Sequence, residues 1–169
     1  ADGVVAGLGI RPNSALAEQA GLDVDNGIVV DALLRTSDPD IYAAGDVANF
    51  YSAALDKRMR VEHEDNANVM GELAGNNMAG QSEIYSHQPY FYSDLFYLGY
   101  EAVGELDSGC EIVEDWKETF HKGVIYYLRD GRVRGVLLWN TWGQVAAATQ
   151  LIAEKSQQNR NTLLGRIHD

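Results

Sequence analysis

Residues 36–46 read Thr-Ser-Asp-Pro-Asp-Ile-Tyr-Ala-Ala-Gly-Asp, and this stretch decides the fold that we expect. Its Ser-Asp-Pro-Asp start is typical of a turn, and the residues that follow predict a short strand over 41–44. Two alanines and Gly45 leave the backbone uncovered, so a flat ligand can approach it closely. Asp46 then stands at the carboxyl end of the strand, where open α/β sheets place their ligands.

The composition narrows the class of partner. The 169 residues are 46% hydrophobic and carry a formal net charge of −12, which fits one large domain or two small ones. This charge argues against nucleic acid and anionic membranes as partners, because both attract cations. No apolar run has the length of a membrane span, and no signal peptide is visible. Cys110 is the single cysteine, which excludes an internal disulfide, offers no metal cluster and favours a cytoplasmic location.

The first residues predict a buried strand over 4–9 that ends in a glycine turn. The chain opens at Ala1 without an initiator methionine, which is typical of the middle of a longer protein. Gly7-Leu8-Gly9 begins like the G-x-G-x-x-G dinucleotide fingerprint, but Pro12 stands at the position of the third glycine. We therefore expect no dinucleotide-binding fold to begin here.

The following residues predict an α/β segment. A short helix is expected over 14–20, a tight turn at residues 25–27, and a loop around a short helical stretch over 47–60. Apolar residues recur at helical spacing over 62–78, and Gly80 gives a stop signal. Gly71 and Gly75 lie inside this helix, where glycine costs about 1 kcal/mol relative to alanine. We expect close packing against a neighbouring element to compensate for both.

The character of the sequence changes near residue 80, which predicts domains over 1–80 and 81–169. Aromatic-rich strands are expected at residues 90–92, 98–106, 110–116, 124–128 and 133–139. Asp130-Gly131 predicts a hairpin between the last two. Helices are expected over 142–155 and within 157–169. Successive strands joined by hairpins indicate an antiparallel sheet with helices on one side, so the predicted class is α+β.

The stretch at residues 36–46 resembles the second flavin-contact motif of flavoprotein reductases that have two dinucleotide-binding domains. In that family the aspartate holds a ribityl hydroxyl of FAD. The resemblance therefore implies that Gly45 and Asp46 contact the cofactor.

Further stretches resemble the same family in the order that the family requires. Residues 7–13 are similar to the segment that returns from the NAD-binding domain, which implies that Gly9 lies beside the nicotinamide and flavin rings. Residues 60–67 and 73–80 are similar to a helix whose N-terminus points at the pyrimidine end of the isoalloxazine. Free backbone amides and the helix dipole stabilise negative charge there. The flavin contacts implied by this helix are Val61, Glu62 and His63.

Residues 90–95 and 99–104 look like the opening of the C-terminal domain in apoptosis-inducing-factor-like reductases and their ferredoxin-reductase relatives. Tyr92 stands where those proteins usually carry tryptophan, which implies a stacking contact with the flavin. Phe91 and Tyr100 are expected in the core. The chain thus resembles the C-terminal portion of an FAD-dependent pyridine nucleotide-disulfide oxidoreductase, namely the second half of the FAD domain and the C-terminal domain.

The resemblance implies that the whole protein passes electrons from NAD(P)H through FAD to an acceptor. The cofactor performs the chemistry, so no catalytic residue is expected in this chain. A ferredoxin, a quinone, oxygen and a peroxide all stay open as acceptors. The basic groups at residues 57–60 and 129–134 are expected to be solvated faces rather than a docking patch.

Three alternatives are weighed against this prediction. A metal site at Glu62, His63 and Asp65 is disfavoured, because no second ligand pair is spaced to complete it. A disulfide reductase is disfavoured because the tail around His168 does not match the histidine–glutamate signature of those enzymes. The second hypothesis is a non-catalytic module for homodimerisation or partner docking, with an aromatic surface at Trp116, Trp139 and Trp142.

Overall fold

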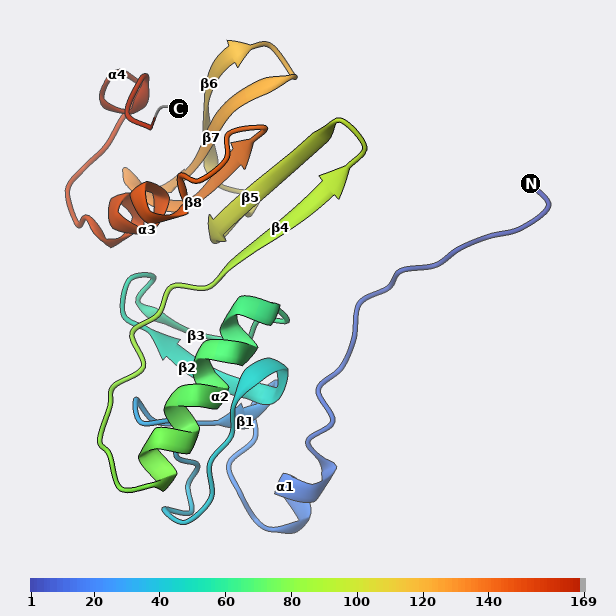
Figure 1. Cartoon of the computed structure of the whole chain (residues 1–169), viewed down its shortest axis with the longest axis vertical. Coiled ribbons are helices and arrows are strands. Elements are labelled where there is room, and N and C mark those ends of the chain that lie inside the picture. Colours follow the sequence, from blue (N-terminus) through green and yellow to red (C-terminus); the bar gives the residue numbers. More distant parts are fainter. Residues whose placement is uncertain (168–169) are drawn as a thin grey trace.

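The computed structural model describes residues 1–167 and forms two sheets with four α-helices among those residues (Figure 1). His168 lies outside the described residues. The first part of the chain contains α1 (Ala15–Gln19), β1 (Ile28–Val29), the 3-10 turn η1 (Gly45–Val47), β2 (Ala48–Ser52), β3 (Lys57–Met59) and α2 (Glu64–Met78). The second part contains β4 (Tyr90–Leu95), β5 (Leu98–Gly104), β6 (Glu111–Glu118), β7 (Lys122–Arg129), β8 (Arg132–Trp139), α3 (Val145–Ala153) and α4 (Arg160–Leu163).

The first part is built around a small sheet of order β1-β2-β3 and the long helix α2. β1 pairs with β2 in parallel, and β2 pairs with β3 antiparallel. The core between the sheet and α2 is formed by Val30, Leu34, Ala43, Ala48, Phe50, Met70, Ala74 and Tyr85. The helix predicted over 62–78 is confirmed, and it begins at Glu64 with two acidic residues in its first turn. Those carboxylates lie where the helix dipole favours negative charge.

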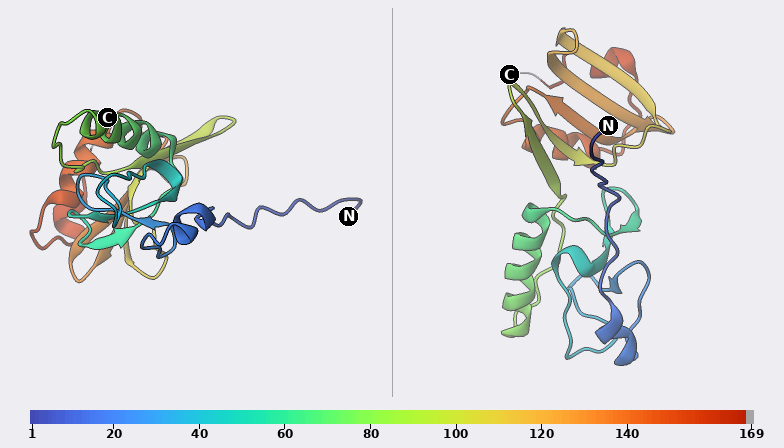
Figure 2. Two further views of the ribbon diagram at one scale, coloured as in Figure 1. Left: turned by 90° about the horizontal axis from the view of Figure 1, so that it is seen from below. Right: turned by 90° about the vertical axis from the view of Figure 1, so that its right-hand side faces the viewer.

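Residues 4–9 do not form the predicted buried strand. Val5 is 99% exposed and Leu8 is 93% exposed, and Figures 1 and 2 show this segment extending away from the rest of the protein. A strand is stable only when a neighbouring strand satisfies its backbone groups. No described residue pairs with this segment, so the apolar run stays extended and unpaired.

Two further predictions in the first part are wrong. Residues 41–44 form only an isolated bridge from Tyr42 to Arg35, because η1 follows immediately and Gly45, at φ +72°, turns the chain out of the extended conformation. The expected loop over 47–60 is instead the β2–β3 hairpin. Phe50 and Ser52 alternate with the exposed Tyr51 along β2, which is the period of a half-buried strand.

The expected close packing of Gly71 and Gly75 is also wrong. A Cβ atom built on either residue meets no described atom within 4 Å outside its own helix. Both glycines therefore weaken α2 without a packing contact that compensates for them.

The second part is a five-stranded antiparallel sheet of order β4-β5-β8-β7-β6. All five predicted strands and the α+β class are confirmed. The hairpin at Asp130-Gly131 joins β7 to β8, with φ values of +53° and +70°, as a type I′ turn requires. α3 covers one face of the sheet, and Ala148 and Ile152 are buried against it. Among the described residues no helix is both long enough and apolar enough to cross a membrane.

Candidate functional site

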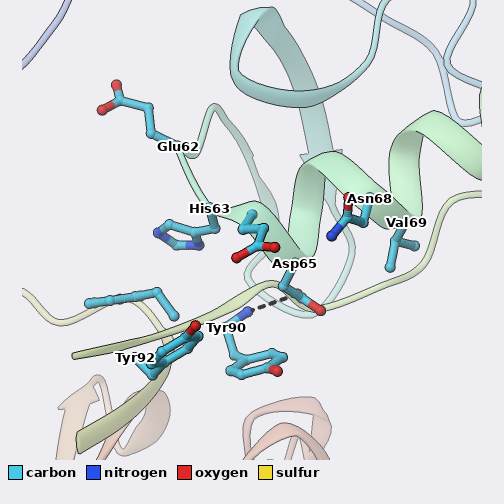
Figure 3. Close-up of a pocket in the computed structure, with 9 residues that line it drawn as sticks. Glu62, His63, Asp65, Asn68, Val69, Tyr90 and Tyr92 are labelled. Atoms are coloured by element: carbon cyan, nitrogen blue, oxygen red, sulfur yellow. Dashed lines mark hydrogen bonds between the residues drawn. The ribbon is translucent and has the colours of Figure 1, made fainter. Parts of the chain in front are cut away.

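A cavity of about 730 Å³ opens between the N-terminus of α2 and strand β4 (Figure 3). Its volume lies in the range of cofactor pockets, about 300 to 1,000 Å³. The residues that line it are Glu62, His63, Glu64, Asp65, Asn68, Val69, Tyr90, Phe91 and Tyr92. Two segments that are distant in sequence therefore form opposite walls of one site.

His63 is the N-cap residue of α2 and has extended backbone geometry, with φ −116° and ψ 132°. Its ring lies against Phe91, with ring centroids 4.7 Å apart. Its Nδ1 atom is buried and has no hydrogen-bond partner. Burial lowers the pKa of His63 below its ordinary value, although the charges of Asp65, Asp46 and Glu62 act in the opposite direction. The cavity wall thus contains an imidazole whose Nδ1 atom is buried and has no hydrogen-bond partner.

Arg60 connects the cavity to the Gly45-Asp46 corner. Its Nη2 atom pairs with Glu62 at 2.9 Å, and its Nη1 atom donates to the backbone oxygen of Asp46 at 2.8 Å. The Arg60 side chain is only 8% exposed. The expectation of a solvated basic face is therefore wrong for Arg60. It is also wrong for Arg134, whose guanidinium binds Glu105 and the oxygen of Leu55.

The structure brings Glu62, His63 and Tyr92 together around the cavity. Tyr92 is 59% exposed, so its ring is available to a ligand. Gly45 lies beneath α2, because a Cβ atom at this position would be 3.3 Å from that of Ala67. Asp46 is exposed and does not line the cavity, yet its charge acts on His63.

Two further proposed cofactor contacts, besides Gly45 and Asp46, do not line the cavity. Gly9 belongs to the extended N-terminal segment, and apart from its two chain neighbours no described residue has an atom within 4 Å of its Cβ position. Val61 packs against the core of the first part rather than lining the cavity. A family contact can depend on parts of a protein that lie outside this chain, whereas the cavity depends only on residues within it.

Sequence reasoning weighed Asp65 as a metal ligand, disfavoured that site, and assigned Asp65 no partner elsewhere in the chain. No group of three or more potential metal-binding side chains occurs among residues 1–167. Asp65 Oδ2 instead accepts a hydrogen bond from the backbone N–H of Tyr90 at 3.3 Å, marked in Figure 3, and pairs with His87 Nε2 at 2.5 Å. His87 gave no sequence signal, because nothing in the order of residues places position 87 beside position 65.

Comparison with known proteins shows to which family the chain that forms this cavity belongs. Residues 1–71 match the family described as pyridine nucleotide-disulphide oxidoreductase. Residues 74–117 and 111–154 match the C-terminal domain described for mitochondrion-associated apoptosis-inducing factor. The chain belongs to the pyridine nucleotide-disulphide oxidoreductase family.

Relatives in this family support the assignment. The chain is 38% identical to apoptosis-inducing factor 1, mitochondrial, of Dictyostelium discoideum, over 91% of this chain and 32% of that protein. It is 33% identical to putidaredoxin reductase of Pseudomonas putida, over 96% of this chain and 39% of that protein. The chain therefore spans about a third of the length of these two relatives.

A solved structure of a covalent putidaredoxin reductase–putidaredoxin complex matches with a TM-score of 0.79 and 32% identity. The match covers 90% of this chain and 37% of that one. It confirms that the antiparallel sheet and its helices have the arrangement of an oxidoreductase of this family.

Proposed function

We propose that this chain forms one wall of the FAD site in an oxidoreductase that passes electrons from NAD(P)H through FAD to an acceptor. The observation that carries the proposal is the cavity at the N-terminus of α2, closed on its other side by the aromatic residues of β4. A helix N-terminus favours negative charge, and an aromatic wall favours a flat ring. An isoalloxazine combines both properties.

The residues present fit this cofactor. The first backbone N–H groups of α2 have no partner within the helix, and His63 Nδ1 is buried without one. When bound, FAD supplies the redox chemistry by accepting a hydride from NAD(P)H and releasing electrons to the acceptor. The α2 N-terminus would stabilise negative charge at the ring, and Asp46 would hold a ribityl hydroxyl. Tyr92 would stack on the flavin, while Phe91 keeps water from His63.

We propose a small redox protein as the acceptor. One structural relative is a reductase joined to putidaredoxin, its partner protein, and this supports a protein acceptor over a quinone, oxygen or a peroxide. The exposed cavity mouth at Tyr92 would let a partner approach the flavin edge.

Flavin retention tests the proposal directly. The protein is incubated with excess FAD, desalted, and its visible absorbance spectrum is recorded. A retained flavin band near one equivalent supports the site. FAD binding by this chain would be refuted if the desalted protein shows no flavin absorbance and if titration with the protein does not change flavin fluorescence.

A second candidate function is homodimerisation or partner docking without catalysis. Exposed aromatic side chains favour it, since Phe96 is 103%, Phe120 is 73% and Trp142 is 47% exposed. Trp116 and Trp139, expected in the same surface, are only partly exposed. Light scattering of the flavin-free protein during gel filtration separates the two functions. Self-association without flavin binding would favour the docking module.

A further inference from the structure

The connector between α2 and β4, residues 79–89, is held along α2 by polar side chains of the helix. It leaves the C-terminal end of α2 and runs back beside the helix to β4 (Figure 1). Near its start, Asn77 Oδ1 accepts from the N–H of Glu83 at 2.8 Å, and Asn77 Nδ2 donates to the oxygen of Glu83 at 2.9 Å. Half-way along, Tyr85 Oη donates to Asn66 Oδ1 at 2.6 Å.

The last of these attachments lies at the cavity. Asp65 binds both His87 Nε2 and the N–H of Tyr90 through the same oxygen, Oδ2. Side-chain exposures of 20% for Asp65 and 30% for His87 place the pair in a partly desolvated position, where hydrogen bonds to a carboxylate are stronger than in water. We name Asp65, His87 and the N–H of Tyr90 the Asp65 clasp.

The clasp acts immediately beside the aromatic wall. Tyr90 is the first residue of β4, so its backbone sets where the next two residues enter the site. Phe91 packs on His63, and Tyr92 lines the cavity. Asp65 lies two residues after His63, in the first turn of α2, and so belongs to the wall that faces β4. One carboxylate therefore fixes the distance between the helix wall and the strand wall.

We propose that Asp65 is a positioning residue of the flavin site, which acts by holding His87 and Tyr90 so that Phe91 and Tyr92 face the α2 N-terminus. This inference rests on the proposed function, because it assigns the aligned walls to a flavin. Nothing in it requires Asp65 to touch the cofactor. Its effect on a ligand passes through β4.

Four variants and a matched control test the clasp. D65A removes both hydrogen bonds, and D65N keeps an acceptor for Tyr90 while removing the charge. H87A removes the second partner, and H87Q restores a donor of similar reach. E72Q makes the same charge change as D65N on the exposed side of α2, outside the cavity and the clasp.

The first readout needs no flavin. Amide hydrogen exchange at Tyr90 is expected to rise about tenfold or more in D65A, in line with the loss of a hydrogen bond to a charged group. It should rise less in D65N and stay unchanged in E72Q. Unchanged exchange at Tyr90 in folded D65A would overturn the clasp, and circular dichroism establishes that the variants are folded.

The second readout is the bound flavin. D65A and H87A are expected to weaken FAD binding about tenfold and to shift the flavin absorption band, while H87Q recovers most of both. If D65A shows faster amide exchange at Tyr90 but keeps the wild-type affinity for FAD and the wild-type flavin absorption band, the positioning role is overturned. Asp65 would then only stabilise the fold. If the wild-type protein does not bind FAD, the proposed function is refuted. The hydrogen-exchange result at Tyr90 alone decides whether the Asp65 clasp exists.

Discussion

The imidazole of His63 and the ring of Phe91 lie 4.7 Å apart between centroids, with their planes inclined by 36°. The first residue precedes α2 and the second belongs to β4, so this contact joins the two parts of the chain at the cavity. Phe91 also meets Tyr100 edge-on at 6.0 Å. The contact therefore shields one face of the imidazole from water and connects the site to β5 of the second sheet. The prediction that Phe91 and Tyr100 lie in the core is wrong, because both are half-buried and belong to neither core cluster.

Phe91→Ala is expected to raise the pKa of His63 toward its ordinary value, because burial is the main cause of its lowering. Protonation of a group with a lowered folded-state pKa opposes folding. The contribution of His63 to stability is therefore present above its unfolded pKa of about 6.5 and is lost as pH falls through the folded value. A pH titration of the His63 ring protons by NMR measures the folded-state pKa in the wild type and in Phe91→Ala. Phe96→Ala, at an exposed turn, is the control that should leave the titration unchanged.

Asp46→Ala is expected to lower the affinity for FAD at least tenfold, because a charge-assisted hydrogen bond to the cofactor would be lost. Flavin fluorescence titration measures the affinity. Asp40→Ala removes a carboxylate from the preceding exposed turn and should bind FAD like the wild type. Equal affinities for the two variants would contradict the role given to Asp46.

Glu105→Gln is expected to lower the free energy of unfolding by about 1–3 kcal/mol. Glu105 accepts from Lys57 at 2.7 Å and from Arg134 at 3.2 Å, and so joins the β2–β3 hairpin to the second sheet. Burial by itself raises the pKa of Glu105, but Lys57 and Arg134 bring it below its ordinary value.

The contribution of ionised Glu105 to the free energy of unfolding is present above the unfolded pKa of Glu105, and it is lost as pH falls through the folded pKa. Urea unfolding at pH 7 and at pH 3 measures it. The difference between Glu105→Gln and the wild type should shrink at the lower pH. Glu111→Gln, at an exposed position on β6, should match the wild type at pH 7.

Two glycine substitutions should have opposite signs. Gly45→Ala is expected to destabilise the protein by about 1–2 kcal/mol, because φ is +72° and the new methyl group would press on Ala67. Gly71→Ala should stabilise it by about 0.5–1 kcal/mol, since it lies inside α2 with open space around it. Thermal unfolding of both variants compares them. A stabilised Gly45→Ala variant would show that the η1 corner is not constrained.

The sequence by itself determined the elements whose signals are local. The helical period of α2 and the Asp130-Gly131 turn are examples, because a helix bonds residues four apart and a tight turn bonds residues three apart. The same holds for the strands of the second sheet, where turns and alternation recur at short intervals.

Only the tertiary structure decided which distant residues meet. The apolar run over 4–9 has the composition of a strand but no strand partner, and Gly45 bends the chain before residues 41–44 can form a ladder. The cavity required α2 and β4 to pack side by side, which brought His63 onto Phe91 and Asp65 onto His87. The spacing of residues in the sequence does not predict such contacts. Their geometry follows from how the helix and the sheet bury their apolar faces together.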